Sequence, residues 1–561
     1  MNQVFGYQIS AEGTFSSNIV FDGTQPVSLP PGFDKKLSQL KVFAHPDSNL
    51  KTYVSEKQGV NTYVLGIPAH PDITFTEIPE WCARIVAAGH YERFKELLGS
   101  FVVIVDEPIQ HRITFVTDIM GLRPFFIGKH NGYIVFGTDV WTLYRAGLSN
   151  RAIDYDAVSE WIIYGYNAGD RSLFSSLSRL PPGAAVIFQD EKYSKIYYTE
   201  IQPKSHTPSP EEVAEDIYAI VSSTVKTLMA DHPRISVALS GGYDSRFLLA
   251  LCSSLTKTTT KCATVSFTSA EGYIATQVAD ILGLTLKIFP VNRSIWDIYD
   301  NVYHFTPNGF PITKFVTYCV AKEYPGMPML NGFVGDVFIS GAINKVLKKY
   351  ESEWKEDLAD LLQRALSMYS FKVFRKLIRK DIFERIRMRA RPPMEKAVRK
   401  ASNISKVFNW AYIYYRQRHY ISNNFLQHIG IAEALIPFYS WSLVSYNMEH
   451  ETKVFSRYIY QRIFQTHYPE LAKIPHADDL ASHKKPFRTA RCTKQWAGQI
   501  LPVLCSKNYL SILQKGLCLP LDIAGLAGLR HAERVIFLFK RLYLLEKQVK
   551  EAGLNFDWEC I

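Results

Sequence analysis

One stretch, RISVALSGGYDSRFLLALCSSL at residues 234–255, constrains the fold of this chain more than any other. It begins with an apolar run rich in β-forming residues, passes through a turn of small residues and continues as a helix-forming run. A strand, a Gly-rich turn and a helix N-terminus in this order place backbone N–H groups around an anion. The stretch therefore predicts an anion-binding loop at residues 240–245.

The side chains of this loop predict phosphate as the anion and Mg²⁺ as its counterion. Gly241 and Gly242 let the backbone approach phosphate closely, and the hydroxyls of Ser240 and Ser245 can hydrogen-bond to its oxygens. Asp244 would repel pyrophosphate unless a divalent cation lay between them. The chain contains no G-x-x-x-x-G-K-[ST], so phosphate transfer of the kinase or GTPase kind is disfavoured.

The next segments continue the strand–helix alternation and predict a parallel sheet. KCATVSF (261–267) is typical of a strand, EGYIATQVADILG (271–283) of a helix, and LTLKIFPV (284–291) of a second strand. A right-handed crossover places a nucleotide at the carboxyl edge of such a sheet, where Ser266 is a further candidate for nucleotide binding.

A second Gly-spaced turn, NGFVGDVFISG (331–341), carries one carboxylate, Asp336. Asp244 and Asp336 could jointly hold Mg²⁺ against a triphosphate. Gly332, in the same turn, is another nucleotide-binding candidate. An isolated Asp336 would instead be an ordinary turn aspartate, but its pairing with the first loop favours the metal site.

The 561 residues are enough for two or three domains. Residues 1–200 contain short β-type runs separated by Gly, Asn and Asp turn signals, and a Pro-rich polar stretch at 201–212 is typical of a linker. We therefore expect one domain at 1–200 and another at 213–561. Beyond about residue 345 the periodicity is helical, and a last long helix is expected at about 529–552.

Charge and cysteine content limit the partners and the compartment. The net charge is +11, and residues 371–406 hold 13 Lys and Arg against 3 Asp and Glu. This segment is either a solvated basic helix face or a docking surface for an anionic partner, and no motif indicates specific nucleic-acid binding. The eight cysteines never form C-x-x-C and no export signal is visible, which favours reduced thiols in the cytoplasm and excludes structural zinc. The lightly charged run at 429–448 is expected to be core and not a membrane span.

Several motifs, in the right order, are similar to the asparagine synthetase family. In the first 200 residues these are a D-x-x-G-x-x-P turn beginning at Asp118 and an LPPG turn ending at Gly183. Later matches are SGGYDS, NGFVGD and AEALIPF (432–438). The resemblance implies an α+β N-terminal Ntn-hydrolase-like β-sandwich, of the class II glutamine-amidotransferase type. It also implies a following α/β parallel-sheet ATP-pyrophosphatase domain with a helical C-terminal part.

The resemblance also implies a reaction. Synthetases of this family use ATP and Mg²⁺ to adenylate a carboxylate, release pyrophosphate and let an amine or ammonia attack. A ligase for a small-molecule or peptide carboxylate in natural-product or surface-sugar biosynthesis is the expected function. A glutamine- or ammonia-dependent asparagine synthetase and an inactive scaffold are the alternatives, together with adenylation for tRNA thiolation, for which Cys252 and Cys262 are the nearest cysteines.

The N-terminal domain departs from the family at its nucleophile. Family glutaminases carry a cysteine directly after the initiator methionine, whereas this chain has Asn2, and its first cysteine is Cys82. We therefore expect no glutamine hydrolysis. β-Lactam synthetases and lasso-peptide cyclases, which also lack that cysteine, are the most similar members in type.

The synthetase domain also departs from the family at several candidate catalytic positions. Where the family places Glu or Tyr, as the second residue of a G-x-G-S-D turn, this chain has Phe333. The base could then be Glu433 or His304, or the substrate amine could arrive already deprotonated. Arg246, directly after the loop, could reach a phosphate or a substrate carboxylate, or be merely exposed. The family also uses a late lysine to stabilise developing charge. Candidates for it lie in the polar stretch 471–488, with Lys484 and Lys485 preferred to Lys473.

Overall fold

The computed structural model describes most of the chain. The described residues are 4–8, 25–26, 40–44, 50–55, 59–130, 133–150, 152–189, 192–200, 207–266, 269–290, 306–309, 317–350, 357–368, 371, 375, 378–400, 403–426, 429, 431–480, 542, 544–556 and 560. Asn2, His304, Lys484 and Lys485 lie outside these residues, and the side chain of Ser266 is not described.

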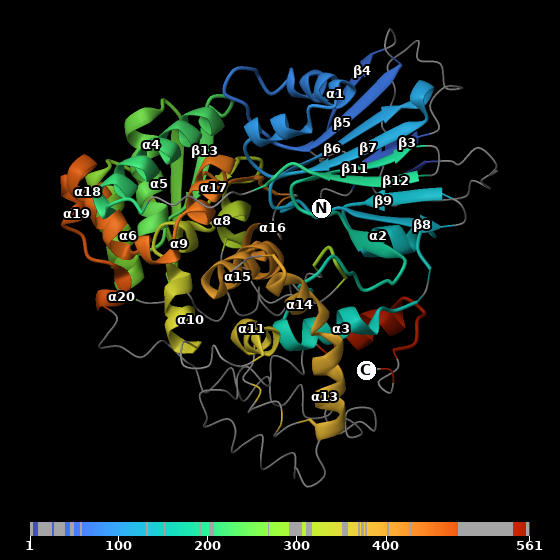
Figure 1. Ribbon diagram of the computed structural model, residues 1–561. Coiled ribbons are helices and arrows are strands. Elements are labelled where there is room, and N and C mark those ends of the chain that lie inside the picture. The colour runs from blue at the N-terminus through green and yellow to red at the C-terminus, as the bar shows by residue number, and fades with distance from the viewer. Residues whose placement is uncertain are drawn as a thin grey trace.

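Two antiparallel six-stranded sheets form the N-terminal part (Figure 1). The first has the order β10-β8-β9-β1-β3-β2 and the second β12-β11-β7-β6-β5-β4. The strands are β1 (Val4–Gln8), β2 (Gln25–Pro26), β3 (Leu40–Ala44), β4 (Leu50–Ser55), β5 (Val60–Gly66), β6 (Phe101–Glu107), β7 (Arg112–Thr117), β8 (Phe126–His130), β9 (Tyr133–Gly137), β10 (Leu177–Arg179), β11 (Ala184–Gln189) and β12 (Lys192–Tyr197). Phe115 of β7 lies edge-on to Phe136 of β9 at 5.2 Å, so aromatic side chains fill the space between the sheets. The antiparallel domain expected from the sequence is confirmed.

The second part contains a five-stranded parallel sheet of order β15-β14-β13-β16-β17. Its strands are β13 (Arg234–Ala238), β14 (Thr259–Ser266), β15 (Leu286–Pro290), β16 (Met329–Leu330) and β17 (Ala434–Leu435). Because β13 and β16 are parallel neighbours, the loops after them emerge side by side at one edge of the sheet. The expected parallel α/β sheet is confirmed, and residues 240–245 lie directly after its central strand.

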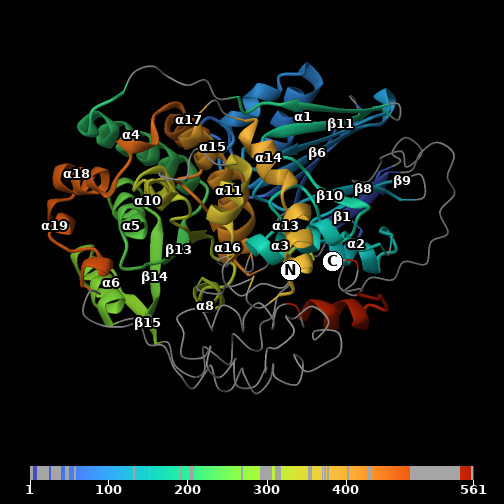
Figure 2. The same ribbon diagram turned by 60° about the horizontal axis from the view of Figure 1, so that its bottom comes forward.

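Helices surround this sheet and fill the space between the two parts (Figures 1 and 2). They are α1 (Ile78–Ala88), α2 (Val140–Arg145), α3 (Tyr155–Tyr164), α4 (Pro210–Met229), α5 (Tyr243–Leu255), α6 (Ser269–Ile281), α8 (Tyr318–Glu323), α9 (Gly335–Phe338), α10 (Ala342–Tyr350), α11 (Leu358–Leu366), α13 (Lys380–Arg389), α14 (Pro392–Val398), α15 (Ile404–Ala411), the π-helix η4 (Tyr412–Ile421), α16 (Asn423–Leu426), α17 (Trp441–Glu449), α18 (Arg457–His467), α19 (Pro469–Ala472) and α20 (Ala477–Leu480), with short 3₁₀ turns η1 (Tyr91–Glu96), η2 (Pro108–Gln110) and η5 (Thr452–Val454).

The linker expected at 201–212 is too long. Ser209 caps α4 by accepting from the Glu212 N–H, and Glu212 bonds back to the Ser209 N–H, a full capping box with Pro210 at the first turn. The Ser-Pro-Glu-Glu sequence is therefore a helix start. The linker prediction extended into it because its residues are polar and include proline, as in a linker. Of the expected helix at 529–552, residues 544–551 are helical and the rest lies outside the described residues.

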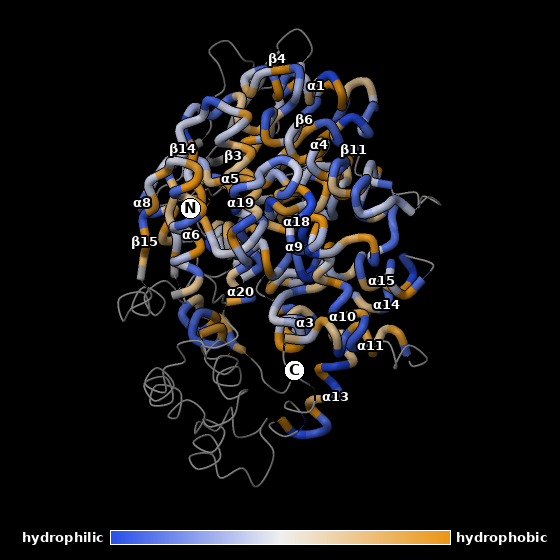
Figure 3. The backbone as a smooth tube through the Cα atoms, turned by 90° about the vertical axis from the view of Figure 1, so that its left-hand side faces the viewer, coloured by the Kyte–Doolittle hydropathy of each residue, from blue (hydrophilic) through white to orange (hydrophobic). Residues whose placement is uncertain are grey.

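A continuous hydrophobic core runs through both parts of the molecule. The run 429–448 contains β17 and all but the last residue of α17, and its residues 432–440 are buried, as expected of core. No helix within the described ranges is long and apolar enough to cross a membrane. Figure 3 shows α13, in the basic segment, as a largely hydrophilic stretch near the lower end of the molecule.

Candidate active site

The loop after β13 is ordered by its own serines. Ser245 Oγ accepts a hydrogen bond from the Ser240 N–H at 3.0 Å and lies 3.0 Å from Ser240 Oγ. Gly242 is the N-cap of α5 and offers no side-chain cap, so the N–H groups of the first turn of this 13-residue helix receive no capping side chain. These N–H groups and the serine hydroxyls can donate to an anion, as the sequence predicted.

The loops after β13 and β16 interlock at Asp244. A Cβ at Gly332 would lie 2.9 Å from Asp244 Cβ, and one at Gly335 would lie 2.7 Å from Asp244 Cγ. Side chains at either position would displace Asp244, which explains why the second loop needs glycine on both sides of Phe333 and Val334. The structure therefore brings together the two loops that the sequence singled out separately.

Asp244 is held by a residue that the sequence did not indicate. Tyr460 of α18 is fully buried and donates a hydrogen bond to Asp244 Oδ1 at 2.6 Å. Burial, and then the charge of Asp336, raise the pKa of Asp244 to about 7, although the Tyr460 hydrogen bond acts in the opposite direction. Two mutually repelling carboxylates are stabilised by a cation between them.

The donor set fits Mg²⁺ bound together with phosphate. Asp336 is exposed and Asp244 half-buried, both at the carboxyl edge of the sheet. No cluster of three or more His, Cys, Asp or Glu side chains that could hold a metal occurs in the described part of the chain. Mg²⁺ commonly uses one or two carboxylates and completes its coordination with water and substrate phosphates. Asp244 and Asp336 match that pattern. Two carboxylates are too few for a metal site whose ligands all come from the protein.

The second loop contains an unusual backbone conformation. Val334 has φ of 62°, in the left-handed region, and it is buried. A β-branched residue is strained there, because its side chain crowds the backbone. Val334 is also the third residue of the turn in which the family pattern has glycine. The loop keeps the glycine-like conformation without the glycine.

Phe333, at the family's usual position for the base, and Glu433, one of the two candidate bases, are both buried in the structure. Phe333 is buried against Phe425 of α16, with ring centroids 5.2 Å apart. Glu433 is buried and forms an ion pair with Arg123 of the N-terminal domain. This ion pair gives Glu433 a role at the domain interface, and a part for it as a base stays a prediction.

Arg246 neither reaches a phosphate nor lies exposed, which corrects both expectations. It is fully buried, and its guanidinium donates to the backbone oxygens of Ile474 at 2.7 Å and Pro475 at 2.8 Å. Ala477, two residues after Pro475, donates its N–H to the Gly241 oxygen at 3.2 Å. Arg246 therefore fastens the segment 474–477 over the anion-binding loop. Lys473 lies on the surface, paired with Glu470.

Buried polar groups join the two domains close to the site. Asp118, at the start of the D-x-x-G-x-x-P turn, accepts from the Leu122 N–H at 2.8 Å and the Arg123 N–H at 3.1 Å, and also from the Tyr439 hydroxyl. Arg418 of η4 donates to the Leu180 oxygen at 2.7 Å, in the LPPG turn region. The D-x-x-G-x-x-P and LPPG turns of the first domain thus contact the second domain directly.

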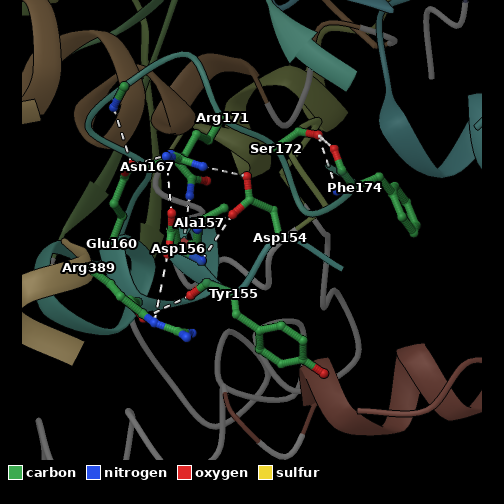
Figure 4. Close-up of polar contacts among 12 residues, drawn as sticks. Asp154, Tyr155, Asp156, Ala157, Glu160, Asn167, Arg171, Ser172, Phe174 and Arg389 are labelled. Atoms are coloured by element: carbon green, nitrogen blue, oxygen red, sulfur yellow. Dashed lines mark hydrogen bonds and ion pairs between the residues drawn. The ribbon is translucent and has the colours of Figure 1, made fainter. Parts of the chain in front are cut away.

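The basic segment is largely engaged within the molecule. Arg389 of α13 lies 3.8 Å from Asp156 of α3, next to a partly exposed group in which Arg171 contacts Asp154 at 2.9 Å and the buried Glu160 at 3.6 Å (Figure 4). Other ion pairs of the segment join Arg379 to Asp381, Arg387 to Asp360 and Glu384, and Arg391 to Asp357 and Glu395. Arg387, Arg389 and Arg391 therefore connect this segment to α11 and α3, and an anionic partner here stays a prediction.

The cysteines nearest the loop do not suit thiolation chemistry. Cys252 and Cys262 are buried, and burial raises the pKa of each thiol to about 12. Among the described residues Cys82, Cys252, Cys262 and Cys319 are buried free thiols.

Two family models match the chain. The model described as a glutamine amidotransferase domain matches residues 83–199, and the model described as asparagine synthase matches residues 216–480. A curated relative, asparagine synthetase (glutamine-hydrolyzing) 3 of Bacillus subtilis (strain 168), is 23% identical over 159 residues, which cover 28% of this chain and 25% of that protein. The match thus spans about a quarter of the relative's length.

Solved structures show a partial likeness at low identity. The allosteric regulatory enzyme of purine biosynthesis has a TM-score of 0.21 and 10% identity, covering 45% of this chain and 67% of that one. Glutamine phosphoribosylpyrophosphate amidotransferase from B. subtilis, complexed with ADP and GMP, has a TM-score of 0.18 and 8% identity. The likeness covers 55% of this chain and 63% of that one. Glutamine-dependent NAD⁺ synthetase from Acinetobacter baumannii, in complex with ADP, has a TM-score of 0.17 and 13% identity. The likeness covers 36% of this chain and 48% of that one.

Proposed function

Because this chain belongs to the asparagine synthase family, with an amidotransferase domain followed by an asparagine synthase domain, we propose that it is an ATP-dependent carbon–nitrogen ligase. It adenylates a substrate carboxylate with ATP and Mg²⁺, and an amine or ammonia then attacks. The observation that carries the proposal is the meeting of Asp244, Asp336 and the uncapped N-terminus of α5 at one sheet edge.

Each part of this edge has a role in the proposed reaction. A carboxylate oxygen of the substrate attacks the α-phosphorus, the bond to pyrophosphate breaks, and an acyl-adenylate forms. The N–H groups of the loop 240–245 hold the departing pyrophosphate. Asp244 and Asp336 would hold Mg²⁺, which supplies positive charge to the phosphates. The amine then attacks the acyl carbon, the bond to AMP breaks, and the amine loses a proton.

The amine is proposed to be free ammonia or part of a biosynthetic intermediate. Asn2 stands where a glutaminase of the family needs cysteine, so the N-terminal domain would serve docking and substrate shaping. In this respect the chain is similar to the β-lactam synthetase and lasso-peptide cyclase type. Natural-product or surface-sugar assembly in the cytoplasm is the setting we propose.

The alternative is a scaffold that kept the fold and lost the chemistry. Phe333 favours it, because a phenyl ring cannot accept the proton of the attacking amine and this one is buried against Phe425. The pair Asp244 and Asp336 disfavours it, because the two carboxylates repel each other without a cation.

The test is ATP–pyrophosphate exchange with the purified full chain, Mg²⁺ and pools of candidate carboxylates. Asp244→Asn is the variant and Asp280→Asn, an exposed position on α6, is the matched control. Exchange that requires one pool and disappears only in Asp244→Asn supports the ligase. A chain that binds no Mg²⁺·ATP in calorimetry would instead be the scaffold.

A further inference from the structure

The π-helix η4 lies between the two domains. It occupies Tyr412–Ile421, between α15 and α16, which lie in the middle of the molecule between the parallel sheet and the N-terminal strands (Figure 1). A π-helix of this length is rare, and π-type turns are frequently found at functional sites. One side chain of η4, Arg418, is engaged by the N-terminal domain through the Leu180 oxygen and, at 3.1 Å, Asp170.

Arg416 of the same helix is in a different situation. Its guanidinium lies over the rings of Tyr412 and Tyr420, at 5.8 Å and 5.3 Å from their centroids. Tyr166 of the N-terminal domain completes the group, with its ring 5.9 Å from that of Tyr420. The cation is thus held against two rings of its own helix, and the N-terminal domain packs on one of them through Tyr166.

No carboxylate compensates this cation within the described residues. None of the ion pairs between described side chains includes Arg416, and the groups that act on it electrostatically are the phenols of Tyr166, Tyr412 and Tyr420. Burial raises the pKa values of Tyr166 and Tyr412, so both phenols are neutral near pH 7. Arg416 also hydrogen-bonds with the Tyr412 phenol, but this half-buried guanidinium has no anionic partner among the described side chains and has further N–H donors for one.

The group lies beside the proposed metal and nucleotide loop. Phe425 of α16, immediately after η4, packs on Phe333 of the NGFVGD loop with centroids 5.2 Å apart. Asp336 is among the charges that raise the pKa of Tyr412, which places this phenol within electrostatic reach of that carboxylate. An anion bound at Arg416 would therefore lie next to the adenylation site.

We propose that Arg416, between Tyr412 and Tyr420, binds a carboxylate group of the acid substrate. The proposal rests on the proposed ligase function and names the part of the chain that selects its acid. A planar guanidinium fixed between rings suits bidentate recognition of a carboxylate, which a lysine would not reproduce. Tyr166 brings the N-terminal domain to this subsite, which gives that domain a part in binding substrate.

The test compares two probes on the full chain, malonate and Mg²⁺·AMP-PNP, by the thermal shift that each produces. Malonate is titrated at constant ionic strength against NaCl, so that a general salt effect is removed. The variants are Arg416→Met and Arg416→Lys, and Arg385→Met, at an exposed position of α13, is the matched control. Malonate should stabilise the wild type and the control, Arg416→Met should lose this shift, and Arg416→Lys should keep less than half of it.

The nucleotide probe separates a substrate carboxylate from the phosphates of ATP. The shift with Mg²⁺·AMP-PNP should be equal in wild type and Arg416→Met, and its loss in the variant would overturn the proposal in favour of phosphate binding. A wild type that shows no malonate shift, or an Arg416→Met protein that retains it, also overturns the proposal. If Arg416→Met does not fold, Arg416→Lys decides by the same comparison.

Exchange kinetics give a second readout once a carboxylate pool is active. Arg416→Met should raise the KM for that acid about 10- to 100-fold, the loss expected for one charged hydrogen-bonded contact, with the KM for ATP unchanged. A failure of the ligase proposal would appear as absent exchange in the wild type, whereas the malonate comparison would still report on Arg416.

Discussion

Tyr460 and Asp244 are 216 positions apart in the chain, and the hydroxyl of the first donates a 2.6 Å hydrogen bond to the carboxylate of the second. The bond favours the charged form of Asp244 against burial and the repulsion of Asp336, which together raise its pKa to about 7. Since Mg²⁺ requires the deprotonated carboxylate, Tyr460 should set the pH range in which the site binds metal.

Tyr460→Phe should therefore weaken Mg²⁺-dependent nucleotide binding at pH 7 by about 3- to 10-fold, consistent with the loss of roughly one charge-assisted hydrogen bond. The apparent Mg²⁺ affinity should rise with pH through neutrality in both proteins, and their difference should shrink at alkaline pH, where Asp244 is charged in either. Calorimetric titration of Mg²⁺ with AMP-PNP at several pH values measures this.

The control for this change is Tyr458→Phe, two positions earlier on α18, whose hydroxyl donates to the exposed Glu211 at 3.1 Å. It should leave metal binding unchanged. Tighter Mg²⁺ binding by Tyr460→Phe would show that the phenol competes with the metal, and would contradict the role given to it here.

Val334 provides a second prediction, from backbone strain. Both Val334→Ala and Val334→Gly remove the buried side chain, but only glycine adopts the observed φ of 62° without strain. Val334→Gly should be the more stable of the two by about 1 kcal/mol, the reverse of the usual order of alanine and glycine. Urea unfolding of the two variants measures the difference, and an alanine variant of equal or greater stability would refute the strain.

The Arg123–Glu433 pair gives a third prediction, about the domain interface. Both side chains are buried, so Glu433→Gln or Arg123→Met should destabilise the protein by about 3–5 kcal/mol, because each leaves a charge without its partner. The double variant Arg123→Met with Glu433→Leu should recover much of this loss. Glu470→Gln, at an exposed pair with Lys473, is the control and should change stability by less than about 1 kcal/mol.

The same variants test whether Glu433 has any catalytic part. If Glu433→Gln leaves the unfolding midpoint unchanged and removes product formation with an altered pH profile, Glu433 is a base after all. Loss of stability with normal residual turnover supports the interface role.

Glu160 gives a fourth prediction, about pH. It is fully buried on α3, it accepts from the Ala168 N–H at 3.0 Å, and burial raises its pKa to about 8. The native state then binds a proton that the unfolded chain has released, so this group should make stability fall as pH rises from about 5 to 8.

Glu160→Gln should remove that dependence, because the amide keeps the acceptor oxygen and cannot ionise. The variant should match the wild type near pH 5 and exceed it at pH 8 by about 1–2 kcal/mol in urea unfolding. Glu395→Gln, on the partly exposed surface of α14, should not change the pH slope. A variant that is less stable than wild type at both pH values would mean that Glu160 is held ionised by Arg171.

Local sequence was sufficient for the elements that carry the chemistry. The apolar run before SGGYDS, its glycines and the helix-forming run after it specify a strand, a turn and a helix through neighbours only a few residues apart. The same holds for the NGFVGD turn and for the change from antiparallel to parallel organisation near residue 210. The fold class, the strand–turn–helix unit at 234–255 and the proximity of Asp244 to Asp336 followed from these patterns, and anion binding by the loop stays a prediction. The linker was misjudged because a capping box and a linker share Ser, Pro and Glu.

Tertiary structure decided everything that depends on partners distant in the chain. Arg246 directly follows the loop in sequence, yet its guanidinium donates to the backbone oxygens of residues 474 and 475. Glu433 forms its ion pair with Arg123, more than 300 positions away. Tyr460 and Arg416 have no local signature, because a tyrosine or arginine in a helix is commonplace until the fold places a carboxylate or an aromatic ring against it. Sequence patterns encode backbone conformation through short-range sterics, whereas the environment of a side chain is created only when separate elements pack together.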